Sequence, residues 1–276
     1  MNVLIDTISD TLSLMAYLFI TYLCLEYLEH KTSQKTKDII IKARSSGPLI
    51  GALCGMLPQC GFSVLATNFY AARVIGIGTL LAVYLSTSDE MLPILISSLT
   101  SPMLIVMISA YKVLCAIIFG YVVYYFYNRT CYTCFDIQTF CEHEHCNCQD
   151  GIFISALTHT LQIGSFIFAV LLMLNAALSY FNLNEYMRYL QIPILGELIS
   201  GIIGLIPNCS ASVLLTQLYI EGYINTSTLI SGSLVNGGVG LIILFKVNQN
   251  LKTNLQIAFT LYVCGVLGGI ISNLFF

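Results

Sequence analysis

Long apolar runs are the feature that most constrains how this chain folds. A helix that spans a bilayer needs about 20 predominantly apolar residues, and several runs reach that length. Only 9% of the residues are charged, against about 25% in soluble domains, so the chain has too little polar surface to face water. The runs do not alternate in the way transmembrane β-strands do. They predict an all-α integral membrane protein, and they cover residues 11–29, 74–85, 102–127, 151–178 and 254–276.

The first run is expected to be a retained helix. The chain lacks a basic start, and no small-residue cleavage site follows residues 18–30, whereas a signal peptide has both features. We therefore expect a multi-pass protein of the cell membrane, with the lipid bilayer as its surroundings and no nucleic-acid partner.

One stretch of sequence occurs twice. Residues 55–70 (GMLPQCGFSVLATNFY) and 204–219 (GLIPNCSASVLLTQLY) are identical at eight of sixteen positions, at an offset of 149 residues. The same offset places Gly47 opposite Gly196, Cys115 opposite Cys264 and Gly120 opposite Gly269. The repeat divides the chain into a first transmembrane half (1–128), a polar linker (129–150) and a second transmembrane half (151–276).

The basic residues indicate that the two halves are inverted. Residues 31–46 carry five Lys or Arg, and their counterpart 180–195 carries only Arg188. Later in each half the bias reverses, because 97–102 has no basic residue while 246–252 has two. Cytoplasmic loops are enriched in Lys and Arg, so equivalent loops are predicted to face opposite sides. That pattern is typical of inverted-topology repeats with an odd number of crossings each.

Five segments per half fit this pattern, which gives about ten transmembrane segments in all. The linker is then cytoplasmic and both termini lie outside. The fourth segment is short and interrupted by a proline, so whether it spans or re-enters stays open. In the first half the segments are 11–29, 47–71, 74–88, 91–98 with its continuation, and 103–127.

The repeated stretch predicts a broken helix in each half. Pro58 and Pro207 disfavour a continuous helix and are favoured at the start of a new one. We expect half-helices to end near Gly55 or Gly204 and to restart at the prolines. Inside a membrane, freed backbone groups are tolerated only in protein or in a wet cavity. Two equivalent breaks therefore indicate a shared cavity near the midplane.

The residue types around these breaks suit an inorganic ion. Half-helix N-termini attract anions, whereas cysteine sulfur suits soft metals and metalloids. Small residues also serve close helix packing, and this alternative stays open. The candidate substrate-binding residues are Gln59, Cys60, Ser63, Thr67, Asn208, Cys209, Ser212, Thr216 and Asn236, and Asn68 and Gln217 could line the same faces.

Acidic residues form a second feature between two apolar segments. Asp89 and Glu90 are candidates for ion or proton coupling, because carboxylates inside membranes are costly and usually functional. Alternatively, they lie at the interface and stabilise the N-terminus of the helix that follows. Lys112 and Glu197 are two more charges in apolar surroundings, and the sequence assigns neither a role.

The central linker is rich in cysteine and histidine. Thiolate and imidazole ligands at such short spacings suit zinc, copper(I) or cadmium. Reduced thiols on the cytoplasmic side favour metal binding over disulfides. A polar linker without a metal is the alternative. The candidate ligands are Cys131, Cys134, Cys141, His143, His145, Cys146 and Cys148.

Three stretches carry a resemblance to a known family. GPLIGALCGMLPQCGFS (47–63), GTLLAVYLSTSDEMLPIL (78–95) and GLIPNCSASV (204–213) resemble the ten-transmembrane heavy-metal exporters, whose members include arsenic efflux proteins and manganese-type transporters. The resemblance covers nearly the whole chain. It implies ten helices in two repeats and efflux across the cytoplasmic membrane. The paired motifs are also similar in layout to the Gln-Ser-Ser motifs of sodium–phosphate cotransporters.

The sequence therefore predicts a secondary transporter that exports a heavy metal or metalloid. The alternative is an exporter of an oxyanion, phosphate or arsenate, bound at the half-helix N-termini. A membrane metal sensor that signals through the linker is a third hypothesis. An enzyme is not expected, because the chain has no HExxH and no paired intramembrane aspartates. Transport of this kind requires no cofactor, and a homo-oligomeric assembly stays open.

Overall fold

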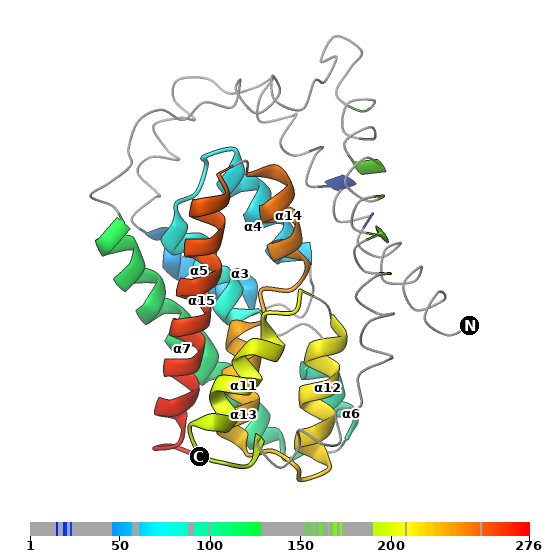
Figure 1. The fold of residues 1–276 in the computed structure, drawn as a ribbon, viewed down its shortest axis with the longest axis vertical. Helices are drawn as coiled ribbons and strands as arrows, with labels where there is room; N and C mark the ends of the chain where they lie inside the picture. Colours follow the sequence, from blue (N-terminus) through cyan, green and yellow to red (C-terminus); the bar gives the residue numbers. More distant parts are fainter. Residues whose placement is uncertain are drawn as a thin grey trace.

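The described part of the chain is built from helices. The computed structural model describes residues 46–56, 61–87, 91–98, 100–127, 190–207, 209–248 and 250–276, with isolated helical positions in 15–23 and 153–172. Every regular element in the ranges just given is a helix (Figure 1). The all-α architecture that the apolar runs predict is confirmed.

The first motif, residues 55–70, covers the end of one short helix and most of the next. Helix α3 (Gly47–Gly55) ends at the glycine where the sequence predicts a break, and α4 (Gly61–Ala71) begins shortly after Pro58. In the second half, α11 (Leu195–Gly204) ends and α12 (Cys209–Ile220) begins in the same way. The predicted helix breaks are confirmed. In the second half, Pro207 precedes α12 instead of lying in its first turn.

Helices α3 and α4 double back on each other, although the sequence predicts a single segment over 47–71. Helix α5 (Ile77–Ser86) runs parallel to α3, because Gly47 lies against Thr79 and Gly55 against Ser86. Helix α4 reaches α5 through a short turn and runs antiparallel to it. The chain therefore reverses direction between α3 and α4. Close glycine contacts between α3 and α5 favour this hairpin over a continuous crossing.

A second break separates α5 from α6 (Met91–Ser97). Residues Ile77–Ile96 together are long and apolar enough for one crossing. Residues 91–98 can thus complete the apolar stretch that begins at 74, so the short fourth segment need not span by itself. Helix α7 (Pro102–Tyr127) follows as a long span.

The second half repeats this helix plan. Its remaining helices are α13 (Thr226–Val235), α14 (Val239–Val247) and α15 (Leu251–Ser272). Helices α11 to α15 correspond in order to α3 to α7. Each begins within one residue of the position reached by adding 149 to the first residue of its counterpart. Helices α7 and α15 run antiparallel, because Tyr111 lies beside Phe275 and Phe276 while Phe119 lies beside Gly268.

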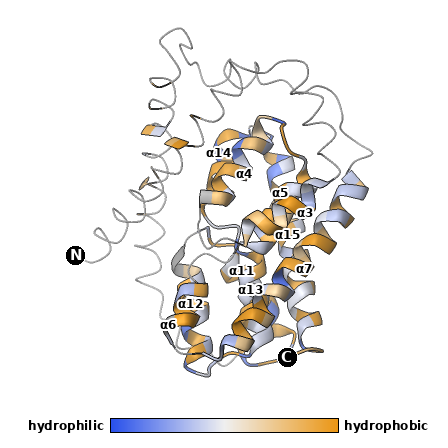
Figure 2. Ribbon diagram, turned by 180° about the vertical axis from the view of Figure 1, so that it is seen from behind, coloured by the Kyte–Doolittle hydropathy of each residue, from blue (hydrophilic) through white to orange (hydrophobic). Residues whose placement is uncertain are grey.

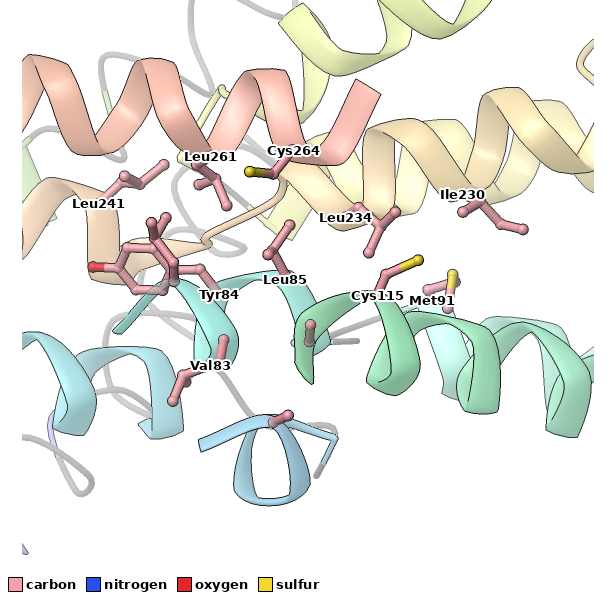
Figure 3. Close-up of a cluster of buried hydrophobic side chains, with 14 of the residues drawn as sticks. Val83, Tyr84, Leu85, Met91, Cys115, Ile230, Leu234, Leu241, Leu261 and Cys264 are labelled. Atoms are coloured by element: carbon pink, nitrogen blue, oxygen red, sulfur yellow. The ribbon is translucent and has the colours of Figure 1, made fainter. Parts of the chain in front are cut away.

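Broken helices form the centre and long helices the periphery. The α13–α14 span is 94% buried, whereas α7 is only 28% buried. Helix α7 instead exposes large apolar side chains such as Met103, Tyr125 and Phe126, as a surface facing lipid tails does. Hydrophobic residues, coloured orange, recur along the α7 ribbon in Figure 2. In the core, Tyr84 and Leu85 of α5 face Leu241 and Leu261 of the second half (Figure 3).

Candidate functional site

The N-terminal turn of α4 packs against the N-terminal turn of α14. Thr67 Oγ1 donates to the carbonyl oxygen of Ser63 at 2.7 Å and lies 3.1 Å from the carbonyl oxygen of Gly240. Gly240 approaches so closely that a Cβ there would lie 2.8 Å from the Ser63 oxygen. The first repeated motif therefore meets the second break of the opposite half, a contact that local sequence does not indicate.

A tyrosine completes this junction. Tyr84 of α5 is fully buried, and its hydroxyl lies 2.6 Å from Thr67 Oγ1. Thr67 has one proton, which goes to a carbonyl, so the Tyr84 hydroxyl donates to Thr67. Sequence reasoning missed Tyr84, and the only available signal was a hydroxyl in an apolar segment just before a predicted break.

The second motif has the same internal hydrogen bond. Thr216 Oγ1 donates to the carbonyl oxygen of Ser212 at 2.7 Å, as Thr67 does to Ser63. Helix α12 packs against α6, just as α4 packs against α14. Each motif helix thus contacts the half to which it does not belong, with the α4–α14 pair and the α12–α6 pair at opposite ends of the molecule (Figure 1).

The break between α13 and α14 is shaped by Asn236. Its side-chain Oδ1 accepts a hydrogen bond from the Gly238 N–H at 3.0 Å. Gly238 has a φ of 56°, in the left-handed region that glycine adopts without strain. The side-chain oxygen of Asn236, a predicted site residue, therefore stabilises the backbone between α13 and α14.

Lys112 links the two halves at the break between α5 and α6. It is fully buried, and its Nζ donates to the carbonyl oxygens of Thr87 at 2.6 Å and Ser233 at 3.0 Å. Thr87 follows the C-terminus of α5, where a helix dipole favours a cation. The one sequence signal for Lys112 is that it is a single charge within the apolar run 102–127.

The side chain of Asn68 has no hydrogen-bond partner among the described residues. Its side chain is fully buried, and neither amide atom makes a hydrogen bond. An unpaired buried polar group costs about 1–3 kcal/mol, so a residue of this kind calls for an explanation. The counterpart Gln217 is exposed, so the repeat plan does not require a buried amide here.

The predicted site residues divide into two groups. Five are described and buried: Ser63, Thr67, Ser212, Thr216 and Asn236. Cys209 begins α12, but its side chain lies outside the description. The remaining candidates lie outside the described residues, and their roles stay predictions: Gln59, Cys60, Asp89, Glu90, Asn208, Cys131, Cys134, Cys141, His143, His145, Cys146 and Cys148.

Among the described residues, hydroxyl, amide and backbone groups dominate the contact of α4 with α14 and the contact of α12 with α6. Among the described residues, no group of three or more His, Cys, Asp or Glu side chains could hold a metal ion. Cys115 and Cys264 are buried in the hydrophobic core. These two cysteines act as small apolar side chains.

The described residues include four segments long and apolar enough to cross a membrane, and two of them are interrupted by breaks. Together with the helix pairs at each motif, they define a multi-pass helical membrane protein with broken helices. The family described as "Putative, 10TM heavy-metal exporter" matches residues 1–136 and 132–264, and the chain belongs to this family of membrane exporters. Comparison with curated proteins and with solved structures gave no match.

Proposed function

We propose that this protein is a secondary transporter that exports a heavy metal or metalloid ion of the arsenic or manganese type. The observation that carries the proposal is the junction of α4 and α14, where Thr67 contacts Gly240 across the two halves. Two broken helices that meet inside a membrane protein form a place where backbone groups can bind an ion. Family membership supports the direction of transport.

An inverted repeat would give the transporter its mechanism. The antiparallel course of α7 and α15 supports it, as does the hydrogen bond of 2.6 Å from the Tyr111 hydroxyl to the Gly268 carbonyl oxygen. In transporters with such repeats, one repeat rocks against the other around a fixed site. Lys112 bonds to both halves and would stabilise one of the two arrangements.

We propose that the predicted substrate ligands act at the contacts of the two motif helices. Ser63, Thr67, Ser212 and Thr216 belong to the motif helices, and Cys60 and Cys209 would add sulfur for a soft ion. Asp89 and Glu90 would couple transport to a second ion. We also place the linker on the cytoplasmic side, where its cysteines and histidines would bind a metal in a regulatory or delivery role.

An oxyanion is the second candidate substrate. Helices α4 and α14 begin side by side, so two positive dipole ends lie close together. The described side chains there are hydroxyls and amides, which suit phosphate or arsenate as well as a metalloid.

A flux experiment separates these substrates. The full chain in proteoliposomes is tested with arsenite, Mn²⁺, Cd²⁺, Zn²⁺, arsenate and phosphate, beside empty vesicles. The proposal predicts saturable flux of arsenite or a metal, and loss of that flux in Cys60→Ser/Cys209→Ser. Flux of phosphate or arsenate that survives the double substitution supports the oxyanion instead. If none of the six ions moves, the transport proposal fails.

A further inference from the structure

A buried carboxylate lies away from the motif junctions, at the start of α11. Glu197 is 1% exposed, and its Oε1 accepts a hydrogen bond from Asn273 Nδ2 at 2.9 Å. Its other oxygen, Oε2, has no hydrogen-bond partner in the described part of the chain. Burying a carboxylate with an unpaired oxygen is costly, and an ionisable residue in a membrane protein core is usually functional.

A second unpaired group lies on the neighbouring helix α13. Ser227 is 3% exposed, and within the ranges that the structure describes its Oγ has no hydrogen-bond partner. One turn further along, Ser231 Oγ donates to the backbone oxygen of Glu197 at 2.8 Å. Residues four apart share a helix face, so Ser227 lies on the face of α13 that packs against α11.

Two members of this cluster, Ser227 and Asn273, line a cavity that is open to the surface. Its volume is about 700 Å³, and it is lined by Ser227, Asn273, Asn225, Thr226, Ser98 and Thr100 among others. Asn273 therefore contacts the cavity and also binds Glu197. The cavity lies near the C-terminus and the start of α13, at the lower end in Figure 1.

The equivalent position in the first half is packed without these polar groups. At the 149-residue offset, Glu197, Ser227 and Asn273 correspond to Pro48, Gly78 and Tyr124. Gly78 packs directly against the backbone and Cβ of Tyr124, and Pro48 packs against Gly120. The helix plan can therefore be built without a carboxylate, so packing alone does not explain Glu197.

We propose that Glu197, Ser227 and Asn273 bind a hard monovalent cation, Na⁺ or a proton, that enters through this cavity. Carboxylate, hydroxyl and amide oxygens suit hard cations, whereas soft metals prefer sulfur. One carboxylate is balanced by one positive charge. That this cation drives export rests on the proposed transport function, but its binding does not.

The other titratable groups around Glu197 belong to the helices packed against it. Tyr262 of α15 donates to the Leu198 carbonyl oxygen at 3.2 Å, and Tyr219 of α12 lines the cavity. Glu221 lies in the turn after α12 and is exposed. Glu221 is therefore the matched control for a change at Glu197.

Cation binding to the purified full chain tests the proposal without any transport measurement. Binding of radioactive sodium and the midpoint of thermal unfolding are measured in Na⁺ and in choline at equal ionic strength, from acidic to alkaline pH. If Na⁺ is the ligand, it binds saturably and raises the midpoint. If the ligand is a proton, the midpoint depends on pH and not on Na⁺.

Either response should be lost in Glu197→Gln and kept in Glu221→Gln. Ser227→Ala removes a hydroxyl that has no partner among the described residues, so this variant should fold normally. It should weaken Na⁺ binding on the order of tenfold. This second variant keeps the proposal testable if Glu197→Gln does not fold. The proposal is overturned if Glu197→Gln keeps the wild-type responses to both Na⁺ and pH, or if the wild type shows neither response. Intact cation binding without ion flux would instead contradict the transport function alone.

Discussion

Thr67 of α4 and Gly240 of α14 are 173 positions apart, and the Thr67 hydroxyl lies 3.1 Å from the Gly240 carbonyl oxygen. This contact joins a motif of the first half to a helix break of the second. Because α14 comes so close at Gly240, the backbone of one half lies directly against the start of a half-helix of the other. The four predictions that follow test this junction and the residues around it.

Gly240→Ala should disrupt the junction. The added Cβ would lie 2.8 Å from the Ser63 carbonyl oxygen and 3.0 Å from the Ser63 Cβ, and overpacking of this kind costs about 1–3 kcal/mol. We expect a lower thermal unfolding midpoint and reduced flux in proteoliposomes. Gly76→Ala is the control, because a Cβ there has no neighbour within 4 Å. Equal behaviour of the two variants would contradict the prediction.

Thr67→Val should be more harmful than Thr216→Val. The Thr67 hydroxyl contacts Tyr84 and Gly240 as well as Ser63, whereas the hydrogen bond from Thr216 goes to Ser212 in its own helix. Each net hydrogen bond contributes about 0.5–1.5 kcal/mol, so the first substitution should cost about twice the second. Denaturation of both variants measures the difference. A double-mutant cycle with Tyr84→Phe should give a coupling energy of about 0.5–1.5 kcal/mol, and a coupling of zero would argue against the Tyr84–Thr67 bond.

Lys112→Met should destabilise the interface between the halves. The substitution keeps an apolar stem but leaves the Thr87 and Ser233 carbonyl oxygens without their charged donor. Losing hydrogen bonds to a charged group costs about 1.5–3 kcal/mol each. Thermal unfolding should show a clear decrease relative to Lys252→Met, whose side chain is exposed on α15. A Lys112→Met midpoint as high as that of the control would show that the lysine is not needed for stability.

Asn68→Leu should separate stability from function. The amide makes no hydrogen bond in the structure, so an apolar side chain of similar size should leave the unfolding midpoint unchanged or raise it. If Asn68 serves the ion pathway, flux should decrease at least severalfold in the same variant. Gln217→Leu, at the exposed equivalent position, should keep its flux. Wild-type flux in Asn68→Leu would remove Asn68 from the pathway.

Local sequence patterns were sufficient to predict much of the fold. Apolar runs of spanning length indicate membrane helices, and the paired glycines and prolines indicate where they break. Helices α3 and α11 end at Gly55 and Gly204 as predicted. These features depend on residues close together in the chain, so the sequence shows them directly.

Only the tertiary structure showed which elements meet. The sequence predicted one segment over 47–71, but the contacts of Gly47 and Gly55 with α5 show a hairpin. Nothing in the periodicity of α5 or α7 indicates that Tyr84 bonds to Thr67 or that Lys112 binds the carbonyl of Ser233.

The surroundings of Glu197 in α11 were also visible only in the tertiary structure. As a sequence feature Glu197 is one acidic residue in an apolar stretch, and only the packing of α11, α13 and α15 brings it to Asn273, which lines an open cavity. The sequence by itself determined which segments are helical and where they break, because hydrophobic length, proline and glycine act on the local backbone. The tertiary structure decided which breaks and which buried polar groups lie together, because those pairings depend on helix packing between distant segments.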